Sequence, residues 1–182
     1  MKCRIVVMMA FLATACSPEG SAGMVAEGSP FPAWKMTAHN GDVVASSDLA
    51  GKPYLLWYYP AAMTPGCTAE GRALRDEHEA YRAAGIEVLG ASFDPPDENR
   101  AFVEAESFPF LLLSDADKKL AQAVGAATSA QQGYARRISY LVGPDGRVIK
   151  GYSEVSPTEH AAEVLADYAA ALREVEVTPA EP

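Results

Sequence analysis

The sequence predicts an α/β fold in which a mixed central sheet is flanked by helices. Apolar runs of strand length alternate with segments that have helical spacing, which is typical of parallel βαβ units. Near the C-terminus, two apolar runs flank the turn sequence Gly143-Pro144-Asp145-Gly146. That pattern predicts a hairpin and therefore an antiparallel edge. The chain has 182 residues, 49% of them hydrophobic, which is enough for one domain with a sizeable core.

Each predicted element follows from a local signal. Apolar runs bounded by turn residues predict strands at residues 54–59, 86–93, 110–113, 137–142 and 147–152. Capping side chains, prolines and terminal glycines predict helices from Thr64 to Gly85, from Pro96 to Glu106, over 117–124 and from the capping box at 156–159 onward. The order βαβ followed by ββα is that of a thioredoxin-like sheet.

The first residues indicate a secretory leader. Lys2 and Arg4 precede an apolar run at 5–13 that is too short to span a bilayer, and small residues follow it. Cys16 comes directly afterwards, and this arrangement resembles the lipobox of bacterial lipoproteins, except that alanine replaces the usual leucine three residues before the cysteine. We expect residues 1–15 to be a signal peptide. The resemblance implies a lipid on Cys16 and a membrane anchor on the periplasmic or cell-surface side. An ordinary secreted protein with an incidental cysteine is the alternative.

The rest of the chain divides by composition. Residues 16–29 are mostly small and polar and predict a flexible tether, 30–175 form the folded domain, and 176–182 are expected to be a loose tail. The formal charge is −9, and no basic stripe points to nucleic acid. The three histidines are scattered, without a carboxylate–histidine spacing that would suggest a metal.

The cysteines limit the redox chemistry. The chain has three, Cys3, Cys16 and Cys67. Cys3 leaves with the expected leader, and a lipidated Cys16 has no thiol. The mature chain then keeps one thiol and has no intrachain disulfide.

Cys67 stands where a thiolate is favoured. If Thr64 is the N-cap, Cys67 is the third residue of a helix that follows a strand. Backbone N–H groups there lack intrahelical partners, and the helix dipole favours a negative charge. A small buried core residue is the alternative, and position alone does not decide between the two.

The segment "YYPAAMTPGCTAE" resembles the active-site segment of the peroxiredoxins (AhpC/TSA-like). The family pattern is proline, three residues, threonine or serine, two residues and cysteine, which here are Pro60, Thr64 and Cys67. The variant Thr-Pro-Gly-Cys-Thr is most similar to the Q-type peroxiredoxins, or bacterioferritin comigratory proteins. The resemblance extends from about Gly28 to the last helix, and it places Arg137, before "ISY", at the position of the family's arginine.

The resemblance implies a thiol-dependent peroxidase that reduces hydrogen peroxide and organic hydroperoxides without a cofactor. Cys67 as thiolate attacks the peroxide and becomes a sulfenic acid. Arg137 stabilises the thiolate and the leaving oxygen. The Thr64 hydroxyl bonds the thiolate or the peroxide, and Pro60 limits the access of water.

The chain departs from the Q-type pattern in one place. Many members carry a resolving cysteine five residues after the first, and here that position is Arg72. We therefore expect a one-cysteine mechanism, with a small thiol or a thioredoxin-like protein as reductant. Two other functions stay open. One is a membrane-tethered thioredoxin-like thiol oxidoreductase, although Thr64 replaces the first cysteine of its Cys-x-x-Cys motif. The other is a non-catalytic binding module on the same fold.

Overall fold

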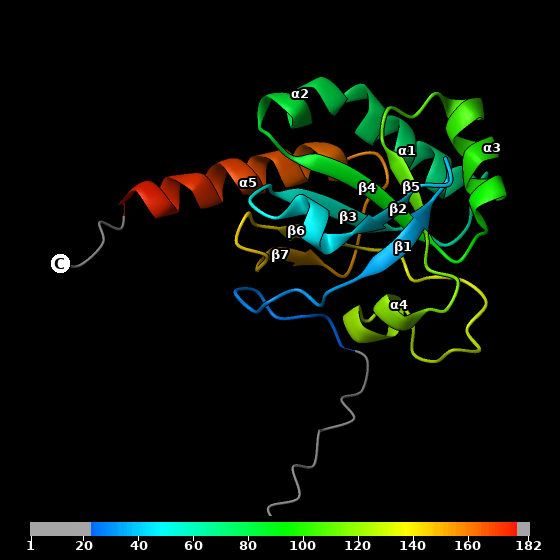
Figure 1. Ribbon diagram of the computed structural model, residues 1–182. Helices are drawn as coiled ribbons and strands as arrows, with labels where there is room; N and C mark the ends of the chain where they lie inside the picture. The colour runs from blue at the N-terminus through cyan, green and yellow to red at the C-terminus, as the bar shows by residue number, and fades with distance from the viewer. Residues whose placement is uncertain (1–22, 178–182) are drawn as a thin grey trace, which may run out of the picture.

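The computed structural model describes residues 23–177, and these form a seven-stranded mixed sheet with helices on both faces (Figure 1). In chain order the elements are β1 (Lys35–Ala38), β2 (Val43–Ala45), the 3₁₀ helix η1 (Ser46–Leu49), β3 (Tyr54–Tyr58), α1 (Pro65–Asp76), α2 (His78–Ala83), β4 (Glu87–Ser92), α3 (Pro96–Glu106), β5 (Leu111–Ser114), α4 (Lys119–Val124), β6 (Ile138–Val142), β7 (Val148–Tyr152) and α5 (His160–Val177). The strand order is β2-β1-β5-β4-β3-β6-β7. The prediction of a mixed α/β sheet with helices on its faces is confirmed.

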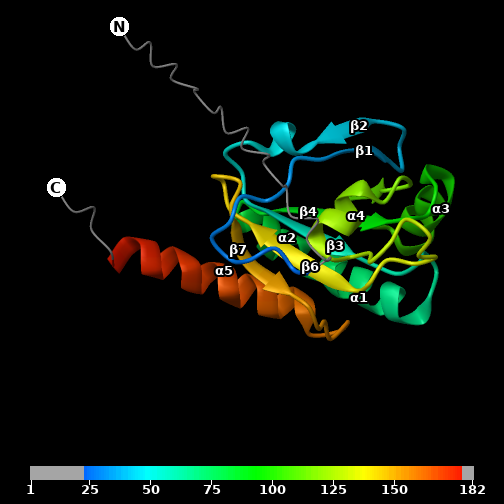
Figure 2. The same cartoon turned by 90° about the horizontal axis from the view of Figure 1, so that it is seen from below.

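The sheet separates two apolar cores. Helices α1, α2, α3 and α5 cover one face, and α4 covers the other together with the N-terminal segment (Figures 1 and 2). The core between the sheet and helices α1, α2, α3 and α5 holds side chains from the central strands and from these helices. Among them are Leu55, Trp57, Cys67, Leu74, Tyr81, Phe102, Leu112 and Val164. Cys67 therefore lies in the layer between the sheet and α1.

Strand register brings two distant segments together. β3 runs parallel to β4 and antiparallel to β6, and Tyr58 at the end of β3 pairs with Ile138 at the start of β6. The residues that follow β3 and the residues that precede β6 therefore lie at the same edge of the sheet. This edge carries the candidate site.

Two predicted helix boundaries were wrong, and one hairpin was missed. The helix expected from Thr64 to Gly85 is interrupted at Glu77, whose N–H bonds the carbonyls of Ala73 and Arg75 in a tight turn. The last helix begins at His160 and not at the expected capping box. The hairpin of β1 and β2 was not anticipated. Its strands are only 4 and 3 residues long, and pairing with β5 supports them.

The expected tether is ordered in part. The Val25 N–H donates to the hydroxyl of Tyr140 at 2.8 Å, and the Gly28 N–H donates to the carbonyl of Val148 at 2.7 Å. Val25 and Gly28, within the expected tether, thus contact strands β6 and β7. The predicted leader, Cys3 and Cys16 lie outside the described residues. Helix α5 reaches Val177, two residues into the expected tail, and 178–182 are not described.

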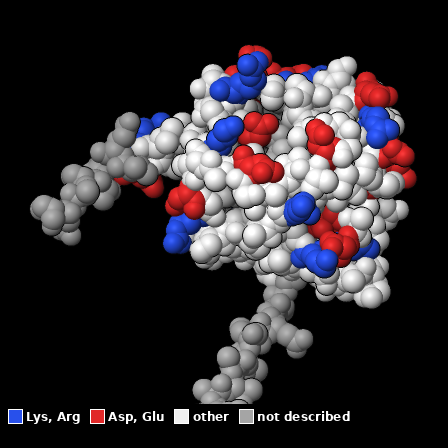
Figure 3. Space-filling view, viewed as in Figure 1, with Lys and Arg blue, Asp and Glu red and all other residues white. Residues whose placement is uncertain are grey.

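The described surface carries charges of both signs. Figure 3 shows acidic and basic side chains interspersed on the face that is drawn. Within residues 23–177, no helix is both long enough and apolar enough to cross a bilayer.

Close packing of α1 on the segment after α3 gives the first prediction. A Cβ atom at Gly71 would lie 2.4 Å from Cζ of Phe108. Alanine ordinarily favours a helix over glycine by up to about 1 kcal/mol. We expect the overpacking to outweigh this, so that Gly71→Ala lowers the free energy of unfolding by about 1–3 kcal/mol.

Denaturant unfolding measures this free energy. Gly133→Ala is the matched control, because a Cβ atom there meets nothing within 4 Å. A Gly71→Ala protein at least as stable as the wild type would contradict the close packing.

Candidate active site

Cys67 is the third residue of α1, which follows β3 after the loop of residues 59–64. Its side chain is 0% exposed, and it is the free cysteine of the described region. Thr64 precedes the helix with extended backbone, and Pro65 occupies the first turn. The carbonyl of Thr64 accepts from the N–H of Thr68 at 2.9 Å. The N–H groups of Gly66 and Cys67 precede the first helical bond, so the helix end favours an anion at the sulfur.

Arg137 supplies a positive charge to the buried sulfur. It stands one residue before β6, and its Nη2 lies 3.4 Å from Sγ of Cys67. A Cβ at position 66 would lie 3.0 Å from this Nη2, so Gly66 makes room for the guanidinium to cross the helix start. Burial disfavours the charged guanidinium of Arg137, but the nearby charges of Glu70 and Cys67 outweigh this effect. The pKa of Arg137 is therefore raised. Its neighbour Arg136 points elsewhere and donates to the carbonyl of Gly125.

Glu70 is a site residue that the sequence analysis missed. It follows Cys67 by three residues and lies on the same face of α1, where its carboxylate pairs with Nη1 of Arg137. The side chain is 0% exposed, and its second oxygen, Oε1, has no partner among the described residues. Burial raises the pKa of Glu70 to about 7, although Arg137 pulls it down. The sequence did hold one signal that could have identified Glu70: a glutamate on the apolar face of the helix, which also carries Leu74.

Thr64 and Pro60 frame the site from the preceding loop. The Thr64 hydroxyl donates to the carbonyl of Ala61 at 2.9 Å and does not form the expected side-chain cap. Pro60 is half-buried beyond the end of β3. The structure therefore places both residues in the loop that leads to Cys67, and their catalytic roles stay predictions.

A polar network fixes this loop against the start of α3. The carboxylate of Asp94 accepts from the N–H of Ala62 at 2.8 Å and from the hydroxyl of Ser92 at 2.9 Å. The Tyr59 hydroxyl donates to the side chain of Asn99 at 2.6 Å. Met63 has a φ of 60°, which is uncommon for a residue with a side chain. The sequence analysis did not identify this network, because its members come together only through the fold.

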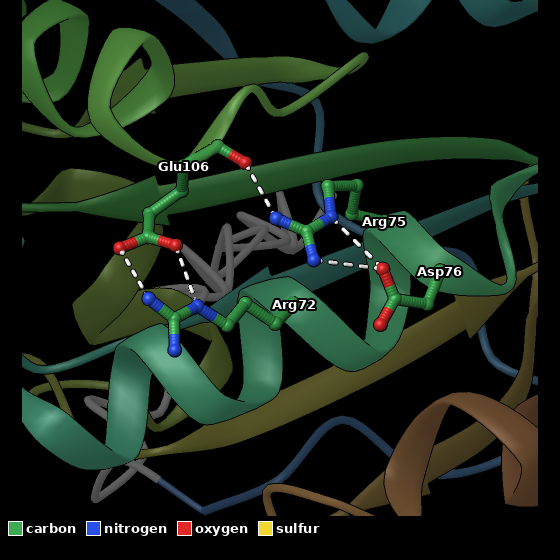
Figure 4. Close-up of polar contacts among 4 residues, drawn as sticks. All are labelled: Arg72, Arg75, Asp76 and Glu106. Atoms are coloured by element: carbon green, nitrogen blue, oxygen red, sulfur yellow. Dashed lines mark hydrogen bonds and ion pairs between the residues drawn. The ribbon is translucent and has the colours of Figure 1, made fainter.

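Arg72 occupies the position where many Q-type members have the resolving cysteine, and it makes an ion pair there (Figure 4). Its Nε and Nη2 donate to the two carboxylate oxygens of Glu106 at 2.6 and 3.1 Å. Arg75 donates to the backbone carbonyl of the same residue at 2.8 Å. Two turns of α1 are thus attached to the last residue of α3.

Known proteins identify the family. Residues 28–150 match the model described as the AhpC/TSA family. The chain is 35% identical to the chloroplastic peroxiredoxin Q of Triticum aestivum over 79% of this chain and 66% of that protein, slightly less than two thirds of its length. It is 33% identical to peroxiredoxin Bcp of Bacillus subtilis over 76% of this chain and 91% of that protein. The crystal structure of peroxidoxin BcpB from Mycobacterium tuberculosis superposes with a TM-score of 0.74 at 30% identity, covering 79% of this chain and 96% of that one. The chain therefore belongs to the AhpC/TSA family of peroxiredoxins, and these relatives are of the Q and Bcp type.

Proposed function

We propose that this chain is a thiol-dependent peroxidase that reduces hydrogen peroxide and organic hydroperoxides through Cys67. The observation that carries the proposal is the contact of 3.4 Å between Arg137 and a buried sulfur at the start of α1. A helix N-terminus and a guanidinium both stabilise a thiolate, which is the reactive form. Family membership supports the same reaction, because the relatives are peroxiredoxins.

The reaction balances with one thiol and one peroxide. The Cys67 thiolate attacks the hydroxyl oxygen of R–O–O–H, an S–O bond forms, and the O–O bond breaks. The electron pair of the broken bond leaves on RO⁻, which becomes ROH when it gains a proton. The positive charge of Arg137 favours this step, because it offsets negative charge both on the sulfur and on the leaving oxygen.

The cysteine positions support a one-cysteine mechanism, which is part of this proposal. Among the described residues, Cys67 is the one cysteine. Cys3 lies in the expected leader, and Cys16 is the expected lipid site. The sulfenic acid then needs an external thiol, from a small molecule or a thioredoxin-like protein. A thioredoxin-type oxidoreductase is disfavoured, because Thr64 stands where its first cysteine would be.

We also propose that a lipid on Cys16 anchors the chain to a membrane after secretion. The leader pattern supports this proposal: a short basic start, an apolar run and a cysteine after small residues. The mature charge is negative, so the lipid and not the protein surface would hold the chain at an acidic membrane.

The role of Arg137 is tested by removing its charge. Arg137→Met should slow peroxide reduction by about 10²-fold or more, since one strong charge-assisted contact is lost. Arg136→Met is the matched control and should retain most of the activity. Stopped-flow assays with hydrogen peroxide and an alkyl hydroperoxide measure the rates, with Cys67→Ser as the blank. Equal rates for the two arginine variants would contradict the assigned role.

The one-cysteine mechanism predicts a sulfenic acid that persists without reductant. One equivalent of peroxide should leave a monomer that dimedone traps at Cys67, and excess peroxide should carry it on to sulfinic acid. Intact-mass spectrometry and non-reducing gels detect these products. Complete conversion to a disulfide-linked dimer, without an early dimedone adduct, would refute the external-thiol scheme.

The lipid anchor is tested by fractionation in a bacterial host. Cys16→Ser should move the full-length protein from the membrane fraction to the soluble one, because the lipid attaches to that sulfur. Cys67→Ser is the control and should stay with the membrane. Membrane association that survives Cys16→Ser would exclude the lipoprotein proposal.

A further inference from the structure

The first turn of α5 encloses a histidine. His160 is the first residue of this helix, and its side chain is 0% exposed. Its ring lies edge-on against the ring of Tyr152 in β7, with the centroids 4.8 Å apart and the ring planes at 80°. Histidine gains a positive charge close to neutral pH, because its ordinary pKa is about 6.5. A histidine without contact to water is therefore a group whose protonation the fold has to oppose or accommodate.

The two ring nitrogens of His160 have different surroundings. Nδ1 lies 3.4 Å from Oε2 of Glu163, whose side chain is 48% exposed. Nε2 is buried and has no hydrogen-bond partner among the described residues. In the neutral ring with its proton on Nδ1, the N–H faces the carboxylate and Nε2 carries only a lone pair. Protonation would place a second N–H at Nε2, and a buried donor without an acceptor is costly.

The charged groups near His160 are partly engaged with one another. Glu163 and Asp167 are the nearby anions on α5. Asp167 already accepts from the hydroxyl of Tyr152 at 2.9 Å and pairs with Nζ of Lys150 at 3.1 Å. Burial disfavours the imidazolium and lowers the pKa of His160, although the charges of the two carboxylates act in the opposite direction. The neutral ring is thus the form that fits the closed turn.

The same turn attaches α5 to two other helices. The hydroxyl of Tyr81 in α2 donates to the carbonyl of Ala161 at 2.8 Å. Burial raises the pKa of Tyr81 and of Tyr152 above the usual range, so neither phenol becomes an anion near neutral pH. Ala161 also borders a groove that Ala69 and Ala73 of α1 line from the other side. His160 therefore lies next to the contacts that join α5 to β7, α2 and α1.

We propose that His160 makes the attachment of α5 sensitive to acid: its neutral ring holds the first turn against β7, and its protonation releases that turn. In the open turn, Nε2–H donates to water and the buried charge is relieved. One proton is taken up for each turn that opens in acid. Opening uncovers the side of α1 that carries Ala69 and Ala73. This proposal does not depend on the proposed peroxidase function.

The direction of the pH dependence follows from the two pKa values of His160. In the closed turn the pKa is lowered, and in the open turn it returns to about 6.5. The stability of the closed turn is fully present above about pH 6.5 and falls as the pH decreases below that value. It stops falling once the pH is below the pKa of the closed turn. The equilibrium constant for opening therefore rises by at most about 30-fold from pH 7.5 to 5.0.

Amide hydrogen exchange at the start of α5 measures this equilibrium. Protection factors, which are corrected for the intrinsic pH dependence of exchange, are compared at pH 7.5 and 5.0 for peptides that cover residues 156–168. In the wild type, the protection should be several-fold lower at pH 5.0. His160→Phe keeps an aromatic ring against Tyr152 but cannot be protonated, so the acid loss should disappear. Equal protection of the wild type at both pH values, or an acid loss that persists in His160→Phe, would overturn the proposal.

The matched control is His39→Asn. His39 follows β1, which lies far from β7 in the strand order, and its Nδ1 accepts from the N–H of Leu112 at 3.2 Å. Asparagine keeps a side-chain acceptor for that N–H and removes the titration. The acid loss at α5 should equal that of the wild type. A control that abolishes the loss would assign it to the protein as a whole and not to His160.

A second variant does not depend on the folding of His160→Phe. Glu163→Gln keeps the histidine but removes the negative charge beside Nδ1, which favours the imidazolium in the closed turn. The pKa of the closed turn then falls further, so the acid loss of protection should grow. Because the carboxylate is half-exposed, we expect an increase of about twofold relative to the wild type, with each protein compared with its own value at pH 7.5. An acid loss in Glu163→Gln that is no larger than in the wild type would contradict the proposal.

Discussion

The site depends on one cation that reaches two buried acids. Arg137 is in place because β6 runs antiparallel to β3, so that the start of one strand meets the end of the other. Gly66 leaves the space through which the guanidinium passes. Without this cation, a thiolate at Cys67 and a carboxylate at Glu70 would both be buried without compensation. The sheet register is therefore a chemical requirement as well as a structural one.

The helix that carries the sulfur is held more firmly in its middle than at its start. Phe108 packs against Gly71, and Arg72 and Arg75 bind the end of α3 (Figure 4). The first turn depends instead on Arg137 and on the loop that Asp94 anchors. In the proposed one-cysteine mechanism an external thiol must reach this sulfur, which is 0% exposed, so the mechanism requires the sulfur to become exposed before resolution.

Local patterns predicted much of the fold and part of the site. Apolar runs located the central strands, and proline and glycine located most helix ends. The resemblance to the peroxiredoxins, and not a local pattern, distinguished Arg137 from Arg136 by its place before "ISY". In the structure Arg137 contacts the sulfur, whereas Arg136 donates to the carbonyl of Gly125. Glu70 was missed because its partner lies far along the chain. The β1–β2 hairpin was missed because its short strands depend on tertiary pairing more than on their own sequence.

Because the site is buried, a change in its net charge is costly in free energy. A sulfur that cycles between thiolate and sulfenic acid gains and loses a full negative charge at each turnover. In an exposed site, water would absorb this change. Here Arg137 contacts both the sulfur and the Glu70 carboxylate, and burial raises the pKa of Glu70 to about 7. The site therefore depends on Arg137, whose positive charge lies against the buried sulfur in place of water.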